Sequence, residues 1–335
     1  MNTQSQKISN GVNIIRVENL TKQFNGLTAV DHVNFEVKKG EIFGFLGPNG
    51  AGKSTTINML STILPVTDGD AFISDFSILS QRDDVRKSIG LVFQDPSLDD
   101  RLTAEENLRF HAKLYGVPSN EFQKRKQEVL ELVDLWDRRG DIVKNFSGGM
   151  KRRLEIARGL LHYPAVLFLD EPTIGLDPQT RAHLWDYILR LKREKEMTIF
   201  MTTHYMNEAE YCDRIAIIDH GKIVASGTPR ELKKQVGGDI IRMSSAQKQK
   251  LKRELEERYK KEIKEEDGTL QLEVADGEKF LPRLFNELDT KIDSIELRKP
   301  TLDDVFLSLT GRKIREEEAS SKDRMREHMR VRGGR

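Results

Sequence analysis

Between residues 47 and 55 the chain reads Gly47-Pro48-Asn49-Gly50-Ala51-Gly52-Lys53-Ser54-Thr55, and this stretch decides the fold. It follows an apolar run at residues 42–46, and the pattern predicts a helix from just after Gly52 to about Leu64. A strand, a glycine-rich turn of this spacing and a helix are the context of a phosphate-binding loop rather than of an ordinary turn. The glycines let backbone N–H groups and the helix N-terminus face the β- and γ-phosphates of a nucleotide. Lys53 then supplies a positive charge, and Ser54 supplies a hydroxyl ligand for Mg²⁺.

The second signal is a strand that ends in two acids. Residues 165–169 are apolar, and Asp170 and Glu171 follow them directly. A buried strand that delivers an acid beside a phosphate-binding loop suits Asp170 for Mg²⁺, through water, and leaves Glu171 to polarise the attacking water. On its own such an ending is as readily a structural turn, but after a phosphate-binding loop the functional interpretation is favoured. The two signals together predict a P-loop nucleotide hydrolase without saying which one.

A third signal is Asn145-Phe146-Ser147-Gly148-Gly149-Met150, which directly precedes a helical pattern at residues 151–161. Ser-Gly-Gly at a helix N-terminus is typical of a phosphate-binding element, although by itself a plain N-cap explains it better. One γ-phosphate cannot lie on two helix N-termini that are far apart in one chain. The simplest resolution is two chains placed head to tail, each completing the other's site.

Strand and helix patterns alternate along most of the chain. This alternation predicts an α/β fold with a mostly parallel sheet, an antiparallel β subdomain and a helical insertion at about residues 97–160. A change of pattern near Val236-Gly237-Gly238 indicates a domain boundary. We expect a disordered N-terminus at residues 1–12, a nucleotide-binding domain at 13–236, a small α+β domain at 237–311 and a charged tail at 312–335 that is frayed or disordered.

Composition narrows the class of protein further. The 335 residues are 37% hydrophobic, enough for a core, and 55 basic against 54 acidic residues leave a net charge of +1. That balance argues against wholesale binding of nucleic acid or of an anionic surface. The longest run without a charged residue, 54–67, is too short and too polar to cross a membrane, and residues 1–12 lack the apolar segment of a secretion signal. The single Cys212 excludes an internal disulfide and a cysteine-based zinc site, so we expect a soluble intracellular protein.

Six motifs in a fixed order make a family resemblance specific. They are the phosphate-binding loop, Gln94 in Leu-Val-Phe-Gln-Asp, the Ser-Gly-Gly motif, the acidic strand, Gly175-Leu176-Asp177 and His204 in Met-Thr-Thr-His. Over about residues 14–235 the chain resembles the nucleotide-binding subunit of an ATP-binding cassette (ABC) transporter. The resemblance implies ATP and Mg²⁺, and a nucleotide site made of Phe24, Gly47, Pro48, Asn49, Gly50, Ala51, Gly52, Lys53, Ser54, Thr55, Gln94, Ser147, Gly148, Gly149 and Asp177.

The resemblance also implies individual roles. Phe24 would stack on adenine, and Gln94 would contact Mg²⁺ and report the nucleotide state to a membrane partner. Asp177 would bridge two subunits, and His204 would contact the γ-phosphate. The metal ligands would be Ser54, Gln94 and Asp170, and the catalytic residues Lys53, Glu171 and His204. The alternatives are a core position for Phe24, a polar loop position for Gln94 and a satisfied strand-end histidine at position 204.

Three residues depart from the usual family pattern. Phe146 and Met150 stand at the ends of a motif that is most often Leu-Ser-Gly-Gly-Gln, so any nucleotide contact of that glutamine side chain is lost. Ser147 and the two glycines keep the part that faces phosphate. Phe24 replaces the more usual tyrosine, which removes a hydroxyl and keeps the π-face.

The C-terminal region points to an exporter. Residues 299–311 predict a capped amphipathic helix with Thr301 as N-cap, Gly311 as its end and one apolar stripe made of Leu302, Val305, Phe306 and Leu309. Core packing explains the stripe fully. The segment nevertheless resembles the C-terminal region of drug-resistance exporter ATPases of the daunorubicin-resistance type.

The resulting hypothesis is a cytoplasmic ATPase that acts as a homodimer beneath a separate transmembrane subunit. It would contact the membrane only through that subunit, bind no nucleic acid, and close its dimer on ATP. One rival is a soluble cassette ATPase with a non-transport partner, but the two cassettes or long coiled coil typical of such proteins are missing from this sequence. A kinase has no use for the Ser-Gly-Gly motif, and the Asn-Lys-x-Asp motif of a GTPase is not found. A regulatory module that never hydrolyses is disfavoured by Glu171 and His204.

Overall fold

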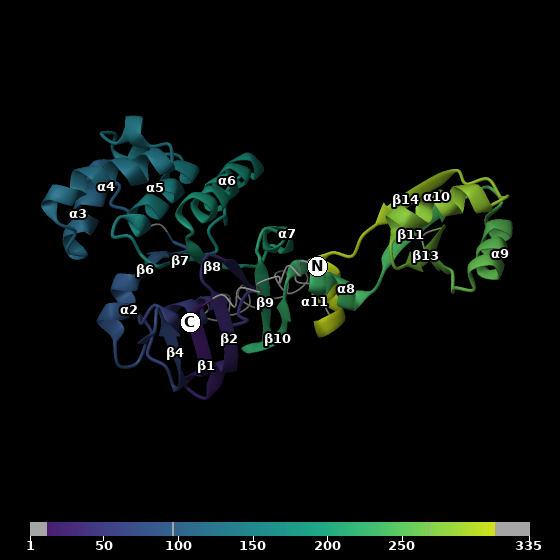
Figure 1. Ribbon diagram of the computed structural model, residues 1–335, viewed down its shortest axis with the longest axis horizontal. Helices are drawn as coiled ribbons and strands as arrows, with labels where there is room; N and C mark the ends of the chain where they lie inside the picture. Colours follow the sequence, from purple (N-terminus) through teal and green to yellow (C-terminus); the bar gives the residue numbers. More distant parts are fainter. Residues whose placement is uncertain (1–11, 96, 267, 312–335) are drawn as a thin grey trace, which may run out of the picture. The chain divides into compact units, whose positions relative to one another are not determined.

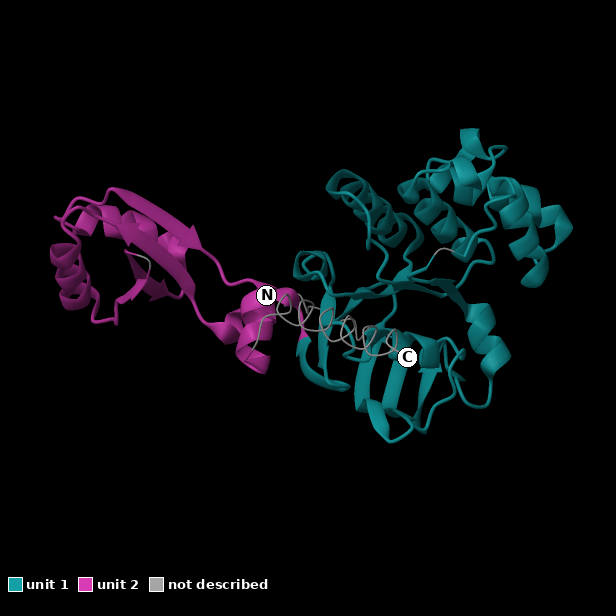
Figure 2. Ribbon diagram, turned by 180° about the vertical axis from the view of Figure 1, so that it is seen from behind, with its two compact units in different colours: residues 1–226, 317–335 teal, residues 227–316 magenta. Residues whose placement is uncertain are grey.

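The computed structural model describes residues 12–95, 97–266 and 268–311, which form two compact units (Figures 1 and 2). The disorder expected at residues 1–12 and the charged tail expected at 312–335 lie outside the described residues, except for Val12. The first unit ends at Ser226, and the second begins at Gly227. Among the described residues, no helix is long and apolar enough to cross a membrane.

The first unit contains a six-stranded sheet made of β3 (Ile42–Leu46), β6 (Ile89–Val92), β7 (Val166–Asp170), β8 (Thr198–Thr203), β9 (Arg214–Asp219) and β10 (Lys222–Gly227). Its order is β10-β9-β3-β8-β7-β6. β3 pairs in parallel with β8 and β9, and β7 pairs in parallel with β6 and β8. Every residue of β3, β7 and β8 is buried, as is usual for parallel strands covered on both faces. The predicted mostly parallel sheet is therefore confirmed.

The antiparallel sheet of the first unit is made of β1 (Asn13–Phe24), β2 (Leu27–Lys38), β4 (Asp68–Ile73) and β5 (Phe76–Ser77), in the order β2-β1-β4-β5. An aromatic cluster joins it to the parallel sheet. The ring of Phe35 on β2 lies 5.5 Å from that of Phe43 and 5.4 Å from that of Phe45, both on β3. Phe200 of β8 lies 5.8 Å from Phe35 and 5.3 Å from Phe168 of β7. One core thus serves both sheets.

The helix after the phosphate-binding loop is shorter than predicted. α1 (Lys53–Leu60) begins where the pattern places it but ends before Leu64. Thr62 has a φ of 62°, and the N–H groups of Thr62 and Ile63 donate to the carbonyls of Met59 and Asn58 at 3.0 and 2.9 Å. These two bonds form the cap that ends a helix with a left-handed residue, a position that glycine usually fills. Because a threonine fills it here, the pattern gives no signal before Pro65.

Three helices form the insertion between β6 and β7: α3 (Ala104–Leu114), α4 (Ser119–Leu132) and α5 (Gly148–Leu160). Figure 1 shows them packed together. Thr103 and Glu106 form a capping box that begins α3, and Ser147 caps α5. The remaining helices of this unit are α2 (Arg82–Ser88), α6 (Pro178–Lys195) and α7 (Met206–Ala209), with short 3₁₀ turns at Trp136–Arg138 and Val143–Asn145.

The second unit contains, in chain order, β11 (Asp239–Ser244), α9 (Lys248–Tyr259), β12 (Lys264–Glu266), β13 (Thr269–Val274), α10 (Gly277–Glu287) and β14 (Ser294–Arg298). The sheet order is β12-β13-β11-β14, and its pairings are antiparallel. A β-α-β-β-α-β chain in this order has the ferredoxin-like arrangement. Alternate strand residues and helical leucines form its core: Ile241, Met243, Leu251, Leu255, Leu270, Leu272, Val274 and Leu284.

The second unit also includes α8 (Pro229–Val236), so it begins earlier than the boundary expected near residue 237. The reason is that α8 packs on α11 (Leu302–Thr310), and Leu232 of α8 is buried. A capping box made by Thr228 and Glu231 begins α8. The helix pair therefore belongs to the C-terminal part of the chain.

The last described helix is capped as the sequence predicts. Thr301 accepts a hydrogen bond from the N–H of Asp304, and Gly311 ends α11 with a φ of 74°. The apolar stripe is only partly confirmed. Leu302, Val305 and Phe306 are buried, whereas Leu309 is 43% exposed. The expectation that Leu309 is buried is therefore wrong. This residue lies in the final turn of the helix, Leu302–Thr310.

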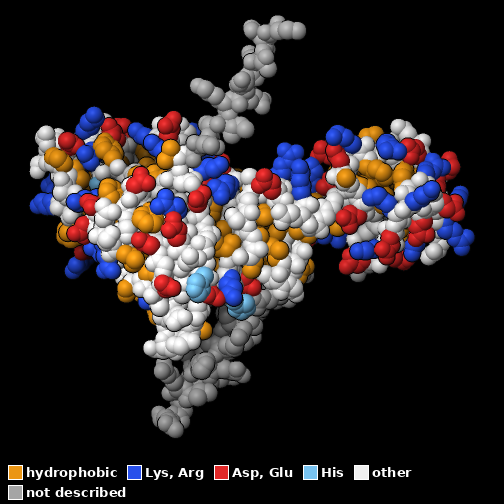
Figure 3. Space-filling view, turned by 60° about the horizontal axis from the view of Figure 1, so that its bottom comes forward, with side chains coloured by type: hydrophobic (Ala, Val, Ile, Leu, Met, Phe, Trp, Pro, Cys, Tyr) orange, Lys and Arg blue, Asp and Glu red, His pale blue; other side chains and the backbone are white. Residues whose placement is uncertain are grey.

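Acidic and basic side chains are interspersed over the face of the molecule in Figure 3. Ion pairs between exposed side chains include Lys248 with Glu265 and Lys299 with Glu278 in the second unit. Exposed pairs of this kind contribute little to stability. Their effect on this surface is to keep large areas of one sign from forming.

We predict that Phe200→Ala lowers the free energy of unfolding of the first unit by about 3–5 kcal/mol, because it removes a fully buried ring from the cluster that joins the two sheets. Urea unfolding followed by tryptophan fluorescence measures the change, since both tryptophans, Trp136 and Trp185, lie in the first unit. Phe110→Ala is the control: its ring is 62% exposed, and we expect a change within about 0.5 kcal/mol. Equal losses in the two variants would contradict the prediction.

Candidate functional site

The phosphate-binding loop lies between β3 and α1 and is tightly enclosed by neighbouring backbone. A Cβ at Gly47 would lie 2.2 Å from the carbonyl oxygen of Ile218. Gly52 has a φ of 108°, and a Cβ there would lie 2.6 Å from the carbonyl oxygen of Ala29. Only glycine fits such positions. The loop therefore has the bare backbone that phosphate groups need for close approach.

Lys53 is the only charged residue of the loop, and it is buried, with 4% of its side chain exposed. Its Nζ donates to the carbonyl oxygens of Gly47 and Pro48 at 2.9 and 3.0 Å, and it lies 3.1 Å from Oε1 of Glu171. A buried ammonium group requires such partners, because an unpaired charge in the interior is very costly. The contact with Glu171 joins the loop to the acidic end of β7.

The carboxyl ends of β3, β7 and β8 meet at one edge of the sheet, where Asp170 pairs in register with Thr202. The Oγ of Ser54 donates to Oδ1 of Asp170 at 3.2 Å, and the hydroxyl of Thr202 donates to the same oxygen. Hydroxyl and carboxylate oxygens are the ligands that Mg²⁺ prefers, so the two residues fit the ion. Among the described residues, no group of three or more His, Cys, Asp or Glu side chains is placed to hold a metal ion.

Glu171 and His204 form the next contact of the site. Nδ1 of His204 lies 2.9 Å from Oε2 of Glu171, and both side chains are buried. Burial alone would raise the pKa of Glu171, but the hydrogen bond from His204 and the charge of Lys53 outweigh it and lower that pKa. Glu171 is therefore a carboxylate at neutral pH. Its φ of 45° is a left-handed conformation, which is uncommon for a residue other than glycine.

A buried acid that the sequence analysis missed supports the histidine. Glu208 on α7 is 1% exposed, and it accepts hydrogen bonds from Thr173, just after Glu171, and from Thr203, just before His204. Burial raises the pKa of Glu208. Its position four residues after His204 was the available signal. Thr202 is a further residue of the site, because its hydroxyl accepts a hydrogen bond from the N–H of Glu171 at 3.0 Å. No sequence pattern indicated this role for Thr202.

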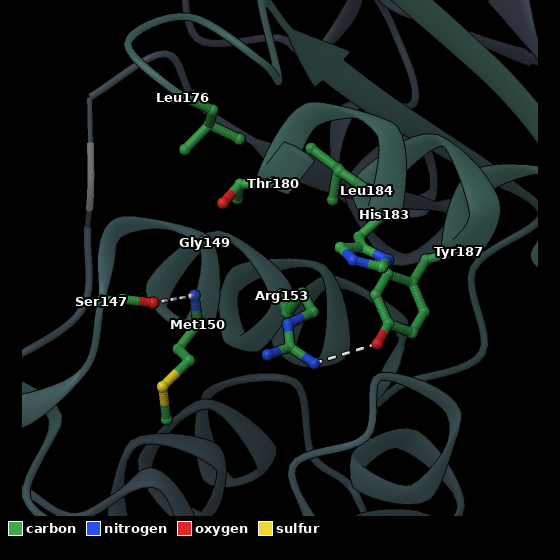
Figure 4. A pocket seen from close by; sticks show the side chains of 9 residues that line it. All are labelled: Ser147, Gly149, Met150, Arg153, Leu176, Thr180, His183, Leu184 and Tyr187. Carbon is green, nitrogen blue, oxygen red and sulfur yellow. Dashed lines mark hydrogen bonds between the residues drawn. The ribbon is translucent and has the colours of Figure 1, made fainter. Parts of the chain in front are cut away.

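The Ser-Gly-Gly motif lies at the start of α5, apart from the phosphate-binding loop. The Oγ of Ser147 accepts the N–H of Met150 at 3.2 Å, so Ser147 is the N-cap of α5. A Cβ at Gly149 would lie 2.4 Å from Thr180 on α6, which explains a glycine at this position. Beside the motif is a pocket of about 270 Å³, and no residue of the phosphate-binding loop lines it. Figure 4 shows its lining from α5, α6 and the segment before α6: Ser147, Gly149, Met150, Arg153, Leu176, Thr180, His183, Leu184 and Tyr187.

Asp177 is the N-cap of α6, a helix that the sequence analysis did not assign. Its Oδ1 accepts the N–H groups of Gln179 and Thr180 at 3.1 and 3.0 Å, and its Oδ2 accepts the hydroxyl of Thr180 at 2.6 Å. The bonds from Thr180 and then from Gln179 lower the pKa of Asp177. An Asp-Pro pair at 177 and 178 is a typical helix start and was the missed signal.

Phe24 and Gln94 lie on the surface. Phe24 is 41% exposed at the end of β1, with Nζ of Lys22 at 4.9 Å from its ring centre, so the alternative of a core position is wrong. Gln94 is exposed in the segment after β6. The structure thus joins Lys53, Ser54, Asp170, Glu171 and His204 by direct contacts. Phe24, Gln94, Ser147 and Asp177 make no hydrogen bond or ion pair with that cluster among the described residues.

Comparison with known proteins agrees with this geometry. Residues 30–174 match the ABC transporter family, and residues 227–310 match the family of C-terminal domains of DrrA1-3-like ATP-binding proteins. The linearmycin resistance ATP-binding protein LnrL of Bacillus subtilis (strain 168) is 40% identical over 90% of this chain and 100% of its own length. The daunorubicin/doxorubicin resistance ATP-binding protein DrrA of Streptomyces peucetius is 38% identical over 93% and 94%.

A solved structure is also similar. The dimeric ATP-binding cassette MJ0796, in a post-hydrolysis state bound to ADP and Pi, has a TM-score of 0.57 and 29% identity over 64% of this chain and 98% of its own. The fold is therefore that of the cassette ATPases, and the C-terminal match narrows the type. This chain belongs to the family of ABC transporter ATP-binding proteins of the drug-resistance type, with a DrrA-like C-terminal domain.

Proposed function

We propose that this chain is the ATP-hydrolysing subunit of an exporter, and that it energises transport through a separate transmembrane subunit by ATP-driven closure of a homodimer. The observation that carries the proposal is the buried cluster in which Glu171 contacts both Lys53 and His204 directly. A cation, a carboxylate and an imidazole at the carboxyl edge of a parallel sheet are the groups that phosphoryl transfer to water requires.

The three side chains divide the work. Lys53 places its charge against the β- and γ-phosphates. When nucleotide binds, these phosphates replace the loop carbonyls and Glu171 as the partners of its ammonium group. Glu171, a carboxylate at neutral pH, accepts a hydrogen bond from the attacking water and so orients and polarises it. His204 holds the Glu171 carboxylate and contacts the γ-phosphate. Ser54 and Asp170, with Gln94, would hold Mg²⁺, which when bound neutralises charge on the phosphate oxygens.

A homodimer follows from the separation of the two phosphate-binding elements. Ser147, Gly148 and Gly149 begin α5 beside a pocket that excludes the phosphate-binding loop of the same chain, and so they suit the nucleotide of a second copy. Asp177 would bridge the two copies, and Phe24 would stack on adenine. The dimeric state of MJ0796 with ADP and Pi supports this arrangement.

The names of the relatives support export. LnrL and DrrA are described as resistance ATP-binding proteins, and both match this chain over nearly its whole length. We infer that this chain lies on the cytoplasmic face of the membrane, reaches the membrane only through its transmembrane subunit, and has no nucleic acid partner. Transport measured in cells that carry the gene with that of its membrane subunit tests the proposal.

We predict that Lys53→Ala lowers the turnover of ATP by about 100- to 1,000-fold, because a preorganised charge on the phosphates is lost. The measurement is phosphate release at saturating ATP. Lys87→Ala is the control, since its side chain on α2 is 75% exposed, and it should keep wild-type turnover. Near-normal turnover in a folded Lys53→Ala protein would mean that the loop is not the active site.

We predict that Glu171→Gln binds ATP but scarcely hydrolyses it, because the amide cannot polarise water and yet keeps the size of the acid. With Mg-ATP this variant should accumulate as a dimer in size-exclusion chromatography, since the γ-phosphate that joins the copies stays attached. Glu194→Gln, an exposed glutamate on α6, should behave as wild type. A Glu171→Gln protein that remains strictly monomeric at saturating ATP would count against shared sites.

We predict that Phe24→Ala weakens nucleotide binding by about 1–3 kcal/mol, the typical worth of a base stacked on an aromatic ring. ATP and GTP should lose similar affinity, because a π-face does not distinguish bases. Equilibrium titration of both nucleotides measures the loss, and Phe285→Ala, which removes another exposed ring in the second unit, is the control. Unchanged affinity would remove Phe24 from the site.

A further inference from the structure

A buried arginine on α5 bonds to three backbone carbonyls in two segments around the site. Nε of Arg152 donates to the carbonyl of Pro172 at 2.8 Å, and Nη2 donates to the carbonyl of Asp170 at 3.0 Å. Nη1 donates to the carbonyl of Phe93 and to Oε2 of Glu155, the latter at 3.0 Å. The side chains of Arg152 and Glu155 are 8% and 1% exposed. Arginine is suited to this task because its planar group carries five donors in fixed directions.

Two of these bonds lie on either side of Glu171. The carbonyl of Asp170 belongs to the peptide unit directly before Glu171, and the carbonyl of Pro172 belongs to the second peptide unit after it. The left-handed φ of 45° at Glu171 costs free energy unless neighbours hold it. Arg152 fixes both carbonyls from the side of α5, while Thr202 holds the N–H of Glu171 from the side of β8. Arg152 and Thr202 therefore bond to the backbone of the turn that contains Glu171.

The third bond reaches the segment that carries Gln94. The carbonyl of Phe93 precedes this glutamine, and the N–H of Ser97 donates to Oε1 of Glu155 at 2.8 Å. Arg158, further along the same helix, donates to the carbonyl of Ser97 at 2.8 Å. Residues 93 and 97, on the two sides of Gln94, are thus both bonded to α5.

A plain stabilising role explains less of this pattern. A buried ion pair is often no better for stability than apolar residues of the same size, and a pair alone would not need three backbone carbonyls from two separate segments. The helix that holds these carbonyls is also the helix that begins at Ser147. Its N-terminus faces a second copy under the proposed function, and its side chains hold the turn of this chain's own acid.

We infer that Arg152, supported by Glu155, is a positioning residue for ATP hydrolysis, because it fixes the Glu171 turn and the Gln94 segment to the helix that carries the Ser-Gly-Gly motif. The inference rests on the proposed function. Its consequence is that two parts of the chain move together as one rigid body. They are the Ser-Gly-Gly motif, which would bind the partner's nucleotide, and Glu171, which would act on the nucleotide bound to its own chain.

The test compares two variants with a matched control in the full-length protein. Arg152→Met/Glu155→Gln removes the charge pair together and leaves no buried charge unpaired, and Arg152→Lys keeps the charge but has fewer donors. The control is Lys126→Met on α4, which removes another buried cation, paired with Glu105 at 2.9 Å. For each protein, kcat, KM for ATP, ATP affinity and the melting temperature are measured, with Glu171→Gln in parallel.

We expect Arg152→Met/Glu155→Gln to lower kcat by about 10- to 100-fold with KM and ATP affinity unchanged, as a small misplacement of a reacting group does. Arg152→Lys should recover part of the loss. Lys126→Met should lower the melting temperature and leave kcat as in the wild type. A folded double variant with wild-type kcat overturns the inference, and so does a loss of kcat that Lys126→Met reproduces.

Failure of the proposed function gives a different result. If Glu171→Gln keeps full turnover, the proposed chemistry falls and this inference falls with it. If Glu171→Gln is inactive while the Arg152 variants turn over like the wild type, only the positioning role is wrong. Should the double variant not fold, Arg152→Lys decides: a reduced kcat at an unchanged melting temperature supports the role, and a wild-type kcat overturns it.

Discussion

The buried ammonium group of Lys53 is the constraint around which the site is arranged. A cation with 4% of its side chain exposed requires partners on every side, and they come from the loop's own carbonyls and from Glu171. Glu171 in turn requires a second donor, which is His204, and His204 follows a threonine held by Glu208. The buried charges of Lys53 and Glu171 thus satisfy each other, and neighbouring polar groups supply the remaining hydrogen bonds. The parallel order β3-β8-β7 makes this possible, because it brings the three carboxyl ends to one edge.

The two parts of the site have different physical characters. The cluster at the sheet edge is buried and closely bonded within one chain, so its geometry is set before any nucleotide arrives. The Ser-Gly-Gly motif is exposed at a helix N-terminus, with free space beside it (Figure 4). Under the proposed function, this difference suits an active site that is completed only when two copies associate. The bonds of Arg152 are the described link between them.

Much of this could be predicted from local sequence. The loop glycines, the acids at the end of β7 and the start of α1 all have a strong signal within a few residues, and the N-cap at Thr301 gave the start of α11 correctly. What could not be predicted depends on register between distant strands or on a single backbone angle. Thr202 meets Asp170 because β7 and β8 pair as they do. The end of α1 depends on a threonine in a glycine-like conformation.

The enclosure of the loop bears on how sequences of this kind should be interpreted. Gly47 and Gly52 are confined by the backbone of Ile218 and Ala29, quite apart from any nucleotide. A descendant that had lost catalysis would still be under selection to keep both glycines, because a side chain there would disrupt the packing of two sheets. The glycines of such a motif therefore indicate that a sequence has this fold, and not that it hydrolyses nucleotide. Lys53 and Glu171 are better indicators that a sequence retains catalysis. The reason is that a buried ion pair can be replaced by apolar residues at little cost in stability once its function is gone.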